Sequence, residues 1–192
     1  ANDYTPFFAL VDTVNATGDY ERIVRSGVDV RQWMRTFAMN DLASYWDGFG
    51  NPNDKNSYLY KPEHDGWKIM CWDFDVGLGV MNDPTNAVLL STDVDPALWR
   101  MDITPAFVRH YWAALDEALA TFFEAGPGTE IDRFLRERYI ALRSAGVNPV
   151  SPFVPGGVYG LSIPDWIAGR RAFIEPQVAA MRSTFAITNA PI

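Results

Sequence analysis

The sequence is short of the residues on which several common kinds of site depend. Its 192 residues include one cysteine and two histidines, which excludes an internal disulfide and gives little support to a zinc site or a Ser-His-Asp triad. No apolar run approaches the roughly 18 residues that a membrane-spanning helix needs, and no basic-then-apolar signal segment opens the chain. A glycine-rich phosphate loop and a dinucleotide-binding fingerprint are missing too.

Positive charge is also scarce. The chain has 16 Lys and Arg against 24 Asp and Glu, a formal net charge of −8 and a pI of about 4.7. Binding to nucleic acid requires clustered cations, so nucleic acid is not an expected partner. An anionic substrate would need help from metal ions or from local Lys and Arg.

Apolar residues, in contrast, are plentiful. Hydrophobic residues make up 48% of the chain and aromatic residues 14%, which is ample for a packed core, and the length fits one domain. We expect this domain to cover residues 1–184 and a linker or tail to cover 185–192. Because a helical pattern follows Ala1 directly, we expect the chain to be a fragment, or the mature form, of a longer protein.

Capping residues and helical spacing predict helices in both halves of the chain. They begin near Thr5, Tyr20, Asp29, Thr104, Thr129 and Ser162.

The clearest of these helices begins at Asp29, where Gln32 would complete a capping box, and continues to Trp46. Asp41 falls on or beside its apolar face, and we interpret it as an edge residue that reaches water, since unpaired acids are rarely buried.

The middle of the chain predicts a β-hairpin. Two strands, at residues 57–61 and 67–72, are separated by the turn sequence Pro-Glu-His-Asp-Gly. From residue 79 to 102 the turn residues predict an irregular segment. The predicted fold class is therefore α+β, mostly helical, with one central hairpin that carries an acidic cluster.

Asp73 and Asp75 follow the apolar strand KIMCW. A carboxylate next to a buried strand is costly unless it is paired or binds a cation. Alternate residues of a strand face opposite sides, so the two acids can share a metal only if the chain turns there, which Gly77 makes plausible. Alternatively, they cap a turn or pair with an arginine of the helices.

Two further polar residues belong to the same region. Asp47 lies where the long helix gives way to a loop, and Asn56 opens the first strand. A proton-accepting Asp, an Asn on a metal and a strand-end Asp on the same metal are the parts of a phosphoryl-transfer site. A loop-capping role for Asp47 is an equally good interpretation. The segment DGFGNPNDKNSY fails the EF-hand pattern, although a looser calcium site stays open.

These residues resemble the CotH kinase-like proteins, named for spore-coat protein H. The resemblance runs through VDVRQWMRTFAMNDLASYWDG and NSYLYKPEHDGWKIMCWDFDVGLG. Its motifs are a Val-Asp-Val helix with an Asp at its end, then Asn-x-Tyr-x-Tyr, then Trp-Lys-hydrophobic-x-x-Trp-Asp-x-Asp and a glycine. The segments PAFVRHYW and WIAGRRAFI are also similar to later parts of the family.

The resemblance implies an atypical protein-kinase-like fold, of which this chain would be the C-lobe. It implies phosphoryl transfer from ATP, with Mg²⁺ or Mn²⁺, to Ser or Thr of secreted or spore-coat proteins, and hence an extracellular, cell-surface or spore-coat location. Asp47 matches the general base, Asn56 and Asp73 match metal ligands, and Asp75 would be a second acid on the metal.

One departure from the kinase pattern bears on activity. Kinases hold ATP with a strand-rich N-lobe and a Lys, whereas the 46 residues before Asp47 predict helices. We therefore expect an N-lobe upstream in the same parent chain, or else a derivative without catalysis. The alternatives are a binding or surface-attachment module of the same fold, and a calcium-stabilised structural domain.

Overall fold

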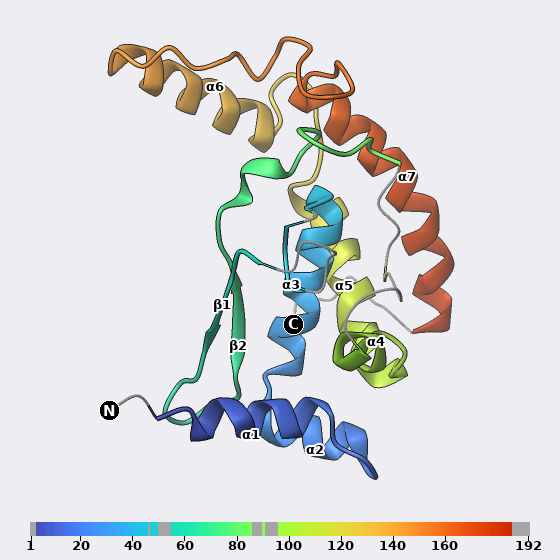
Figure 1. The fold of residues 1–192 in the computed structure, drawn as a ribbon. Helices are drawn as coiled ribbons and strands as arrows, with labels where there is room; N and C mark the ends of the chain where they lie inside the picture. Colours follow the sequence, from blue (N-terminus) through green and yellow to red (C-terminus); the bar gives the residue numbers. More distant parts are fainter. Residues whose placement is uncertain (1–2, 46, 50–54, 86–89, 91–95, 186–192) are drawn as a thin grey trace.

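A computed structural model describes residues 3–45, 47–49, 55–85, 90 and 96–185, and these residues form a mostly helical α+β fold (Figure 1). The predicted fold class is thus confirmed as far as α+β. In chain order the elements are α1 (Thr5–Val14), α2 (Tyr20–Gly27), α3 (Val30–Ala43), β1 (Ser57–Tyr60), β2 (Lys68–Cys71), the 3₁₀ turn η1 (Phe74–Val76), α4 (Pro96–Asp102), α5 (Pro105–Thr121), α6 (Glu130–Ser144) and α7 (Ile163–Thr184). Within the described ranges, no helix combines the length and the apolar character that crossing a membrane requires.

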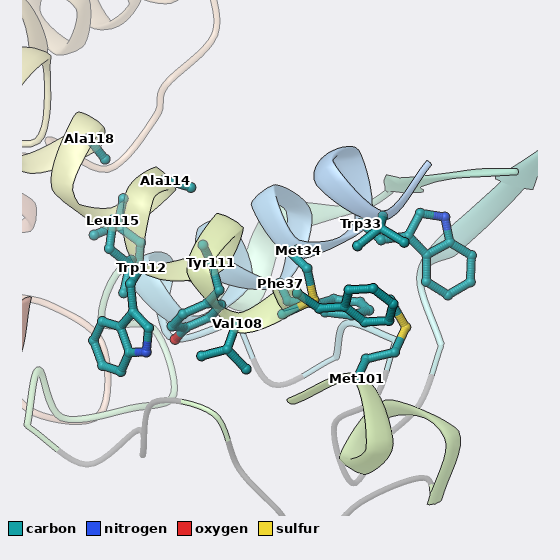
Figure 2. Packing of buried hydrophobic residues seen from close by; sticks show 14 of the residues in the cluster. Trp33, Met34, Phe37, Met101, Val108, Tyr111, Trp112, Ala114, Leu115 and Ala118 are labelled. Carbon is teal, nitrogen blue, oxygen red and sulfur yellow. The ribbon is translucent and has the colours of Figure 1, made fainter. Parts of the chain in front are cut away.

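The core lies where α3 and α5 pack side by side, with the hairpin on α3 and with α7 on α5 (Figure 1). Figure 2 shows large side chains of the two helices and of α4 meeting there. These side chains are at most 8% exposed: Trp33, Met34, Phe37, Met101, Val108, Tyr111, Trp112 and Leu115. Their spacing of three and four residues places them on one face of each helix, as the sequence pattern predicted.

The start of α3 is fixed to the hairpin by its capping residues. The Asp29 carboxylate accepts from the backbone N–H of Gln32 at 3.0 Å and from Lys68 Nζ at 2.6 Å. The Gln32 side chain does not return to Asp29 as a capping box requires. Its amide instead accepts from Ile69 N–H at 2.9 Å and donates to Ile69 C=O at 2.6 Å. The predicted box is therefore half right, and its second half joins the helix to β2.

The end of α3 differs from the prediction. The helix stops at Ala43, three residues before Trp46, because Ser44 adopts a left-handed conformation with φ 51°. Tyr45 N–H then donates back to Asn40 C=O at 2.8 Å. Asp47 therefore lies in the segment after the helix and not at its last turn.

Three other boundaries also differ from the sequence prediction. The helix α4 falls in the segment 79–102 that was expected to be irregular, because Pro96 was taken as a turn residue and instead opens a helix. Thr5 lies inside α1, whose N-cap is Tyr4, and α5 ends at Thr121. Helices α6 and α7 begin after the predicted caps Thr129 and Ser162.

The predicted hairpin is confirmed. Strands β1 and β2 pair antiparallel, with Ser57 opposite Cys71 and Tyr60 opposite Lys68. Gly66 precedes β2, where the chain passes so close to α3 that a Cβ at this position would lie 2.4 Å from the backbone nitrogen of Asp29. A residue without a side chain is therefore needed to seat the hairpin on the start of α3.

Candidate active site

Tyr45 holds the end of α3 against the end of β2. Its hydroxyl lies 2.7 Å from Trp72 C=O and 3.0 Å from Asp73 C=O, and it also makes a side-chain hydrogen bond with Asn56. The ring stacks on Phe74 with centroids 4.0 Å apart. Because Tyr45 is only 2% exposed, these contacts form a fixed centre around which the predicted site residues are arranged.

Asp47 and Asn56 lie together at the two ends of the loop between α3 and β1. The Asn56 Nδ2 donates to Asp47 Oδ2 at 3.3 Å, and the backbone N–H of Lys55 donates to Asp47 C=O at 3.3 Å. Asp47 is 6% exposed, and burying a carboxylate is costly unless it has partners. Here the partners are the Asn56 amide and the Lys55 ammonium, whose Nζ is 3.6 Å from the same carboxylate oxygen.

Asp73 is brought to the same place by a sharp turn. Its φ of 56° is left-handed, and the 3₁₀ turn η1 begins at the next residue. The backbone N–H of Trp72 donates to Asn56 C=O at 2.8 Å, so Asp73 directly follows a residue bonded to Asn56. The chain was expected to turn near Gly77, but it turns at Asp73 itself. A left-handed conformation is strained for a residue with a side chain, and such strain is concentrated at functional sites.

Asp75 lies further along the chain from Tyr45 than Asp73 does. Both acids are exposed, and within the described part of the chain neither carboxylate makes a hydrogen bond or ion pair. Asp73 differs from Asp75 in that its backbone C=O accepts from Tyr45 OH. The structure therefore places Asp47, Asn56 and Asp73 around Tyr45 and leaves Asp75 one turn further along the chain. A metal-binding role for Asp75 stays a prediction.

Acidic side chains lie near Tyr45. Burial raises the pKa of Tyr45, its hydrogen bond with Asn56 lowers it, and the nearby Asp47 and Asp73 carboxylates raise it further. The hydroxyl thus stays protonated at neutral pH. The donor atoms available to a cation are carboxylate and amide oxygens, which are the ligands that Mg²⁺ prefers.

The donor set fits a cation whose shell is completed by other molecules. Among the residues described, no three His, Cys, Asp or Glu side chains are grouped so that they could hold a metal. Mg²⁺ is usually bound by one or two carboxylates together with phosphate oxygens and waters, and Asp73 with Asn56 can supply that protein share. Residues 50–54 of the loop considered for calcium lie outside the described part.

Cys71 and His64 take no part in the cluster. Burial raises the pKa of the Cys71 thiol to about 11, and Sγ lies 2.9 Å from Asn40 Oδ1, so the thiol stays protonated. His64 is exposed in the hairpin turn, with its side chain 89% accessible.

The comparison with protein families decides the relationship. The family model described as "CotH kinase protein" matches residues 1–131 of the 192. The chain belongs to the CotH kinase protein family. The resemblance inferred from the central motifs is therefore confirmed, and the match includes Asp47, Asn56 and Asp73. No curated protein matched the chain.

Sequence reasoning missed two residues of the candidate site. Tyr45 was counted only as an apolar position of the helix, and Lys55 was counted only as part of a loop. The spacing of Tyr45 and Asp47, two residues apart after a helix, is the signal that could have suggested a shared site. For Lys55, its position next to Asn56 is the corresponding signal.

A second acidic cluster, which includes Asp41 near the end of α3, corrects the interpretation of that residue. The Asp41 carboxylate does not simply reach water, because Oδ2 accepts from Tyr111 OH at 2.6 Å and from Leu90 N–H at 3.3 Å. Burial is the main cause that raises the pKa of Asp41, to about 6. Arg170 of α7 donates to the backbone C=O of Asp41 at 2.5 Å, which ties the end of α3 to α7.

Asp102 completes this second cluster. Its Oδ1 is buried and has no hydrogen-bond partner among the described residues. Burial, and then the charge of Asp41, raise the pKa of Asp102 to about 8. This pair could not be predicted from the sequence, because the two acids are sixty-one positions apart and come near each other only in the fold.

Proposed function

We propose that this chain is the catalytic-loop and metal-binding half of a protein kinase of the CotH type. The reaction is the transfer of the γ-phosphoryl group of ATP to Ser or Thr of a protein. The observation that carries the proposal is the cluster around Tyr45, in which the side chains of Asp47 and Asn56 contact each other, and the Tyr45 hydroxyl contacts the Asn56 side chain and the backbone carbonyl of Asp73. The same cluster supports a protein-kinase-like C-lobe as the fold.

In this proposal Asp47 is the general base for the substrate hydroxyl. Phosphoryl transfer depends on positioning and on charge stabilisation more than on covalent chemistry. The contacts of Asp47 with Asn56 and Lys55 fix the orientation of its carboxylate. The Lys55 ammonium, which lies beside the base, is suited to stabilise negative charge on the transferred group.

Asp73 and Asn56 are the proposed metal ligands, with Asp75 as a further acid, and Mg²⁺ or Mn²⁺ as the cation. A bound divalent ion supplies neutralisation of the phosphate charge. The left-handed turn at Asp73 and the contact of its backbone with Tyr45 hold this residue near Asn56 in advance of binding. Preorganisation of this kind is what a site needs when it contributes few ligands of its own.

The grip on ATP is the part that these residues do not supply. In the described structure three helices, α1 to α3, precede Asp47, whereas kinases hold the phosphates with a strand-rich lobe and a Lys. We therefore assign that task to an N-lobe elsewhere in the parent protein. A secreted, cell-surface or spore-coat location rests on the family resemblance alone.

The test is a phosphorylation assay of the natural full-length protein with γ-labelled ATP, Mg²⁺ or Mn²⁺ and a Ser/Thr-rich protein. Asp47→Asn and Asp73→Asn should each lower the rate by at least about 100-fold, the lower end of the contribution of a positioned acid or base. Asp12→Asn, on the exposed face of α1, is the matched control and should keep the rate. Equal rates in all three variants would contradict the assignment.

The alternative of a binding module is favoured by one observation. Three aromatic side chains of the hairpin are exposed: Tyr58 and Tyr60 by 53% each and Trp72 by 58% of their surface. The rings of Tyr58 and Trp72 are in edge contact, with centroids 5.6 Å apart. Such a face can stack on sugars or peptides. Ligand binding that needs neither ATP nor Asp73, in a protein without phosphorylation activity, would support this function.

A further inference from the structure

A groove of about 680 Å³ runs between α3 and β2, two elements that lie side by side in Figure 1. Its apolar lining is partly open to solvent, since Met39, Met70 and Phe74 are 37%, 46% and 41% exposed. Methionine side chains adapt to different apolar partners. A groove of this kind suits the side chains of an extended peptide.

One end of the groove reaches the candidate active site. Phe74 lines it and also stacks on Tyr45, and Cys71, which lines it too, contacts Asn40 near the end of α3. A peptide in the groove would therefore have one of its ends near Asp73, the residue before Phe74.

The other end of the groove is basic. Arg31 and Arg35 line it from successive turns of α3. Among the described residues Arg31 makes no ion pair or hydrogen bond, and the pair of Arg35 with Glu117 is exposed on both sides, at 41% and 52%. The one acid of the lining, Asp29, already contacts Lys68 at 2.6 Å.

The positive charge at this end is a local feature of an acidic chain. Although the formal net charge is −8, three cations lie near His110. Burial lowers the pKa of His110, Arg25, Arg31 and Arg109 lower it further, and Asp29 raises it. Opposite charge on a partner is what steers it to such a surface and fixes its orientation.

We infer that this groove docks a segment of a partner protein in which an apolar side chain is followed by acidic ones. On α3, Met39 lies four residues after Arg35 and eight residues after Arg31. These separations correspond to about 6 and 12 Å along the helix. An extended chain covers this length with about two to four residues. The apolar side chain fills the part lined by Met39, Met70 and Phe74, and the carboxylates meet Arg31 and Arg35.

This docking needs neither ATP nor a metal ion, so it can be tested apart from the proposed kinase function. The probe is a fluorescein-labelled twelve-residue peptide with two leucines and, three residues later, two glutamates. Its binding to the whole chain is measured by fluorescence anisotropy. Two control peptides are measured in the same way: one has two lysines in place of the glutamates, and the other has two serines in place of the leucines. The glutamate peptide should bind at least about tenfold more tightly than either.

A charge exchange assigns the binding to the groove. Arg31→Glu should lower the affinity for the glutamate peptide about three- to tenfold, which is the range expected when an exposed ion pair is replaced by repulsion. The same variant should raise the affinity for the lysine peptide, and a general loss of folding cannot have that effect. Met70→Asp should lower the affinity for the glutamate peptide. Arg133 is an exposed arginine on α6, and Arg133→Glu should leave the affinities for both peptides unchanged.

Three outcomes would overturn the docking proposal. They are no binding of the glutamate peptide, equal binding of the three peptides, and a loss in Arg133→Glu as large as that in Arg31→Glu. Peptide binding in a protein whose phosphorylation activity is absent would leave the docking inference standing and count against the kinase function alone.

Discussion

The amide of Asn56 donates to the carboxylate of Asp47 at 3.3 Å across nine residues of chain. The same loop is closed by two backbone contacts at its base, from Lys55 N–H to Asp47 C=O and from Phe49 N–H to Ser57 Oγ. The spacing of Asp47 and Asn56 is thus set by the loop ends. These contacts therefore hold the two side chains together.

Tyr45→Phe should separate the positioning role of the hydroxyl from the packing role of the ring. The ring can still stack on Phe74, but the carbonyls of Trp72 and Asp73 lose a donor. We expect the free energy of unfolding to fall by about 1 kcal/mol and the phosphorylation rate to fall more than this loss of stability explains. Urea unfolding and the kinase assay measure the two effects. Tyr139→Phe on α6 is the control, and an unchanged rate in Tyr45→Phe would show that the hydroxyl does not position Asp73.

The half-buried pair Asp41 and Asp102 should make stability depend on pH. Burial raises the pKa of Asp102 from 3.8 to about 8, so the folded state holds a proton that the unfolded state releases. The resulting stabilisation is complete below pH 3.8 and is lost as the pH rises through about 8. The pKa of Asp41, raised to about 6, acts in the same direction. The free energy of unfolding from urea titrations should therefore fall between pH 5 and pH 9.

Asp102→Asn provides the check on that pH dependence. The amide carries no charge, so the variant should flatten the profile and should be more stable than the parent at pH 9, where the parent must hold an ionised carboxylate out of water. Asp12→Asn, on the surface of α1, should leave the profile as it is. A profile in Asp102→Asn identical to that of the parent would rule out Asp102 as its source.

The parts of the fold that sequence could predict are those governed by local chemistry. Alternating residues predicted the hairpin, and Thr129 and Ser162 marked helix starts because a cap needs only residues within one turn. The end of α3 could not be predicted, because Ser44 carries no feature that distinguishes a left-handed cap from another helical turn. Asp41 was misplaced since its partner Tyr111 lies seventy residues away.

In the candidate site, too, the sequence predicted residues but not the contacts between distant parts of the chain. Asp47, Asn56 and Asp73 came from a motif, which names residues without giving the contacts between them. The role of Tyr45 depends on the carbonyls of Trp72 and Asp73, and a tyrosine at the end of an apolar helix face gives no sign of such partners. Buried aromatic residues with a polar tip thus deserve inspection whenever they stand within two residues of a motif acid.

Gly66→Ala should loosen the hairpin from α3. A Cβ there would lie 2.4 Å from Asp29 N and 2.5 Å from the carbonyl carbon of Val28, both backbone atoms that cannot rotate away. Overpacking of this kind costs about 1 to 3 kcal/mol, to be measured by urea unfolding. Gly156→Ala, where the nearest atom is 3.9 Å away, should cost less than a third as much. Equal losses in the two variants would mean that the approach of the hairpin to α3 is not what requires a glycine.

The two acids after β2 should contribute unequally to metal binding. Asp73 is fixed before any cation arrives, by its left-handed backbone and by the contact of its carbonyl with Tyr45. Asp75 makes no such backbone contact within the described residues, so fixing its backbone costs about 1 to 2 kcal/mol more on binding, while both carboxylates are exposed. The affinity for Mn²⁺ can be measured by titrating the natural protein with ATP present. Asp73→Asn should lower this affinity more than tenfold, and Asp75→Asn should lower it about two- to fivefold. The control Asp12→Asn should bind as the parent does. A larger loss in Asp75→Asn than in Asp73→Asn would reverse the assignment and make the residue on η1 the main ligand.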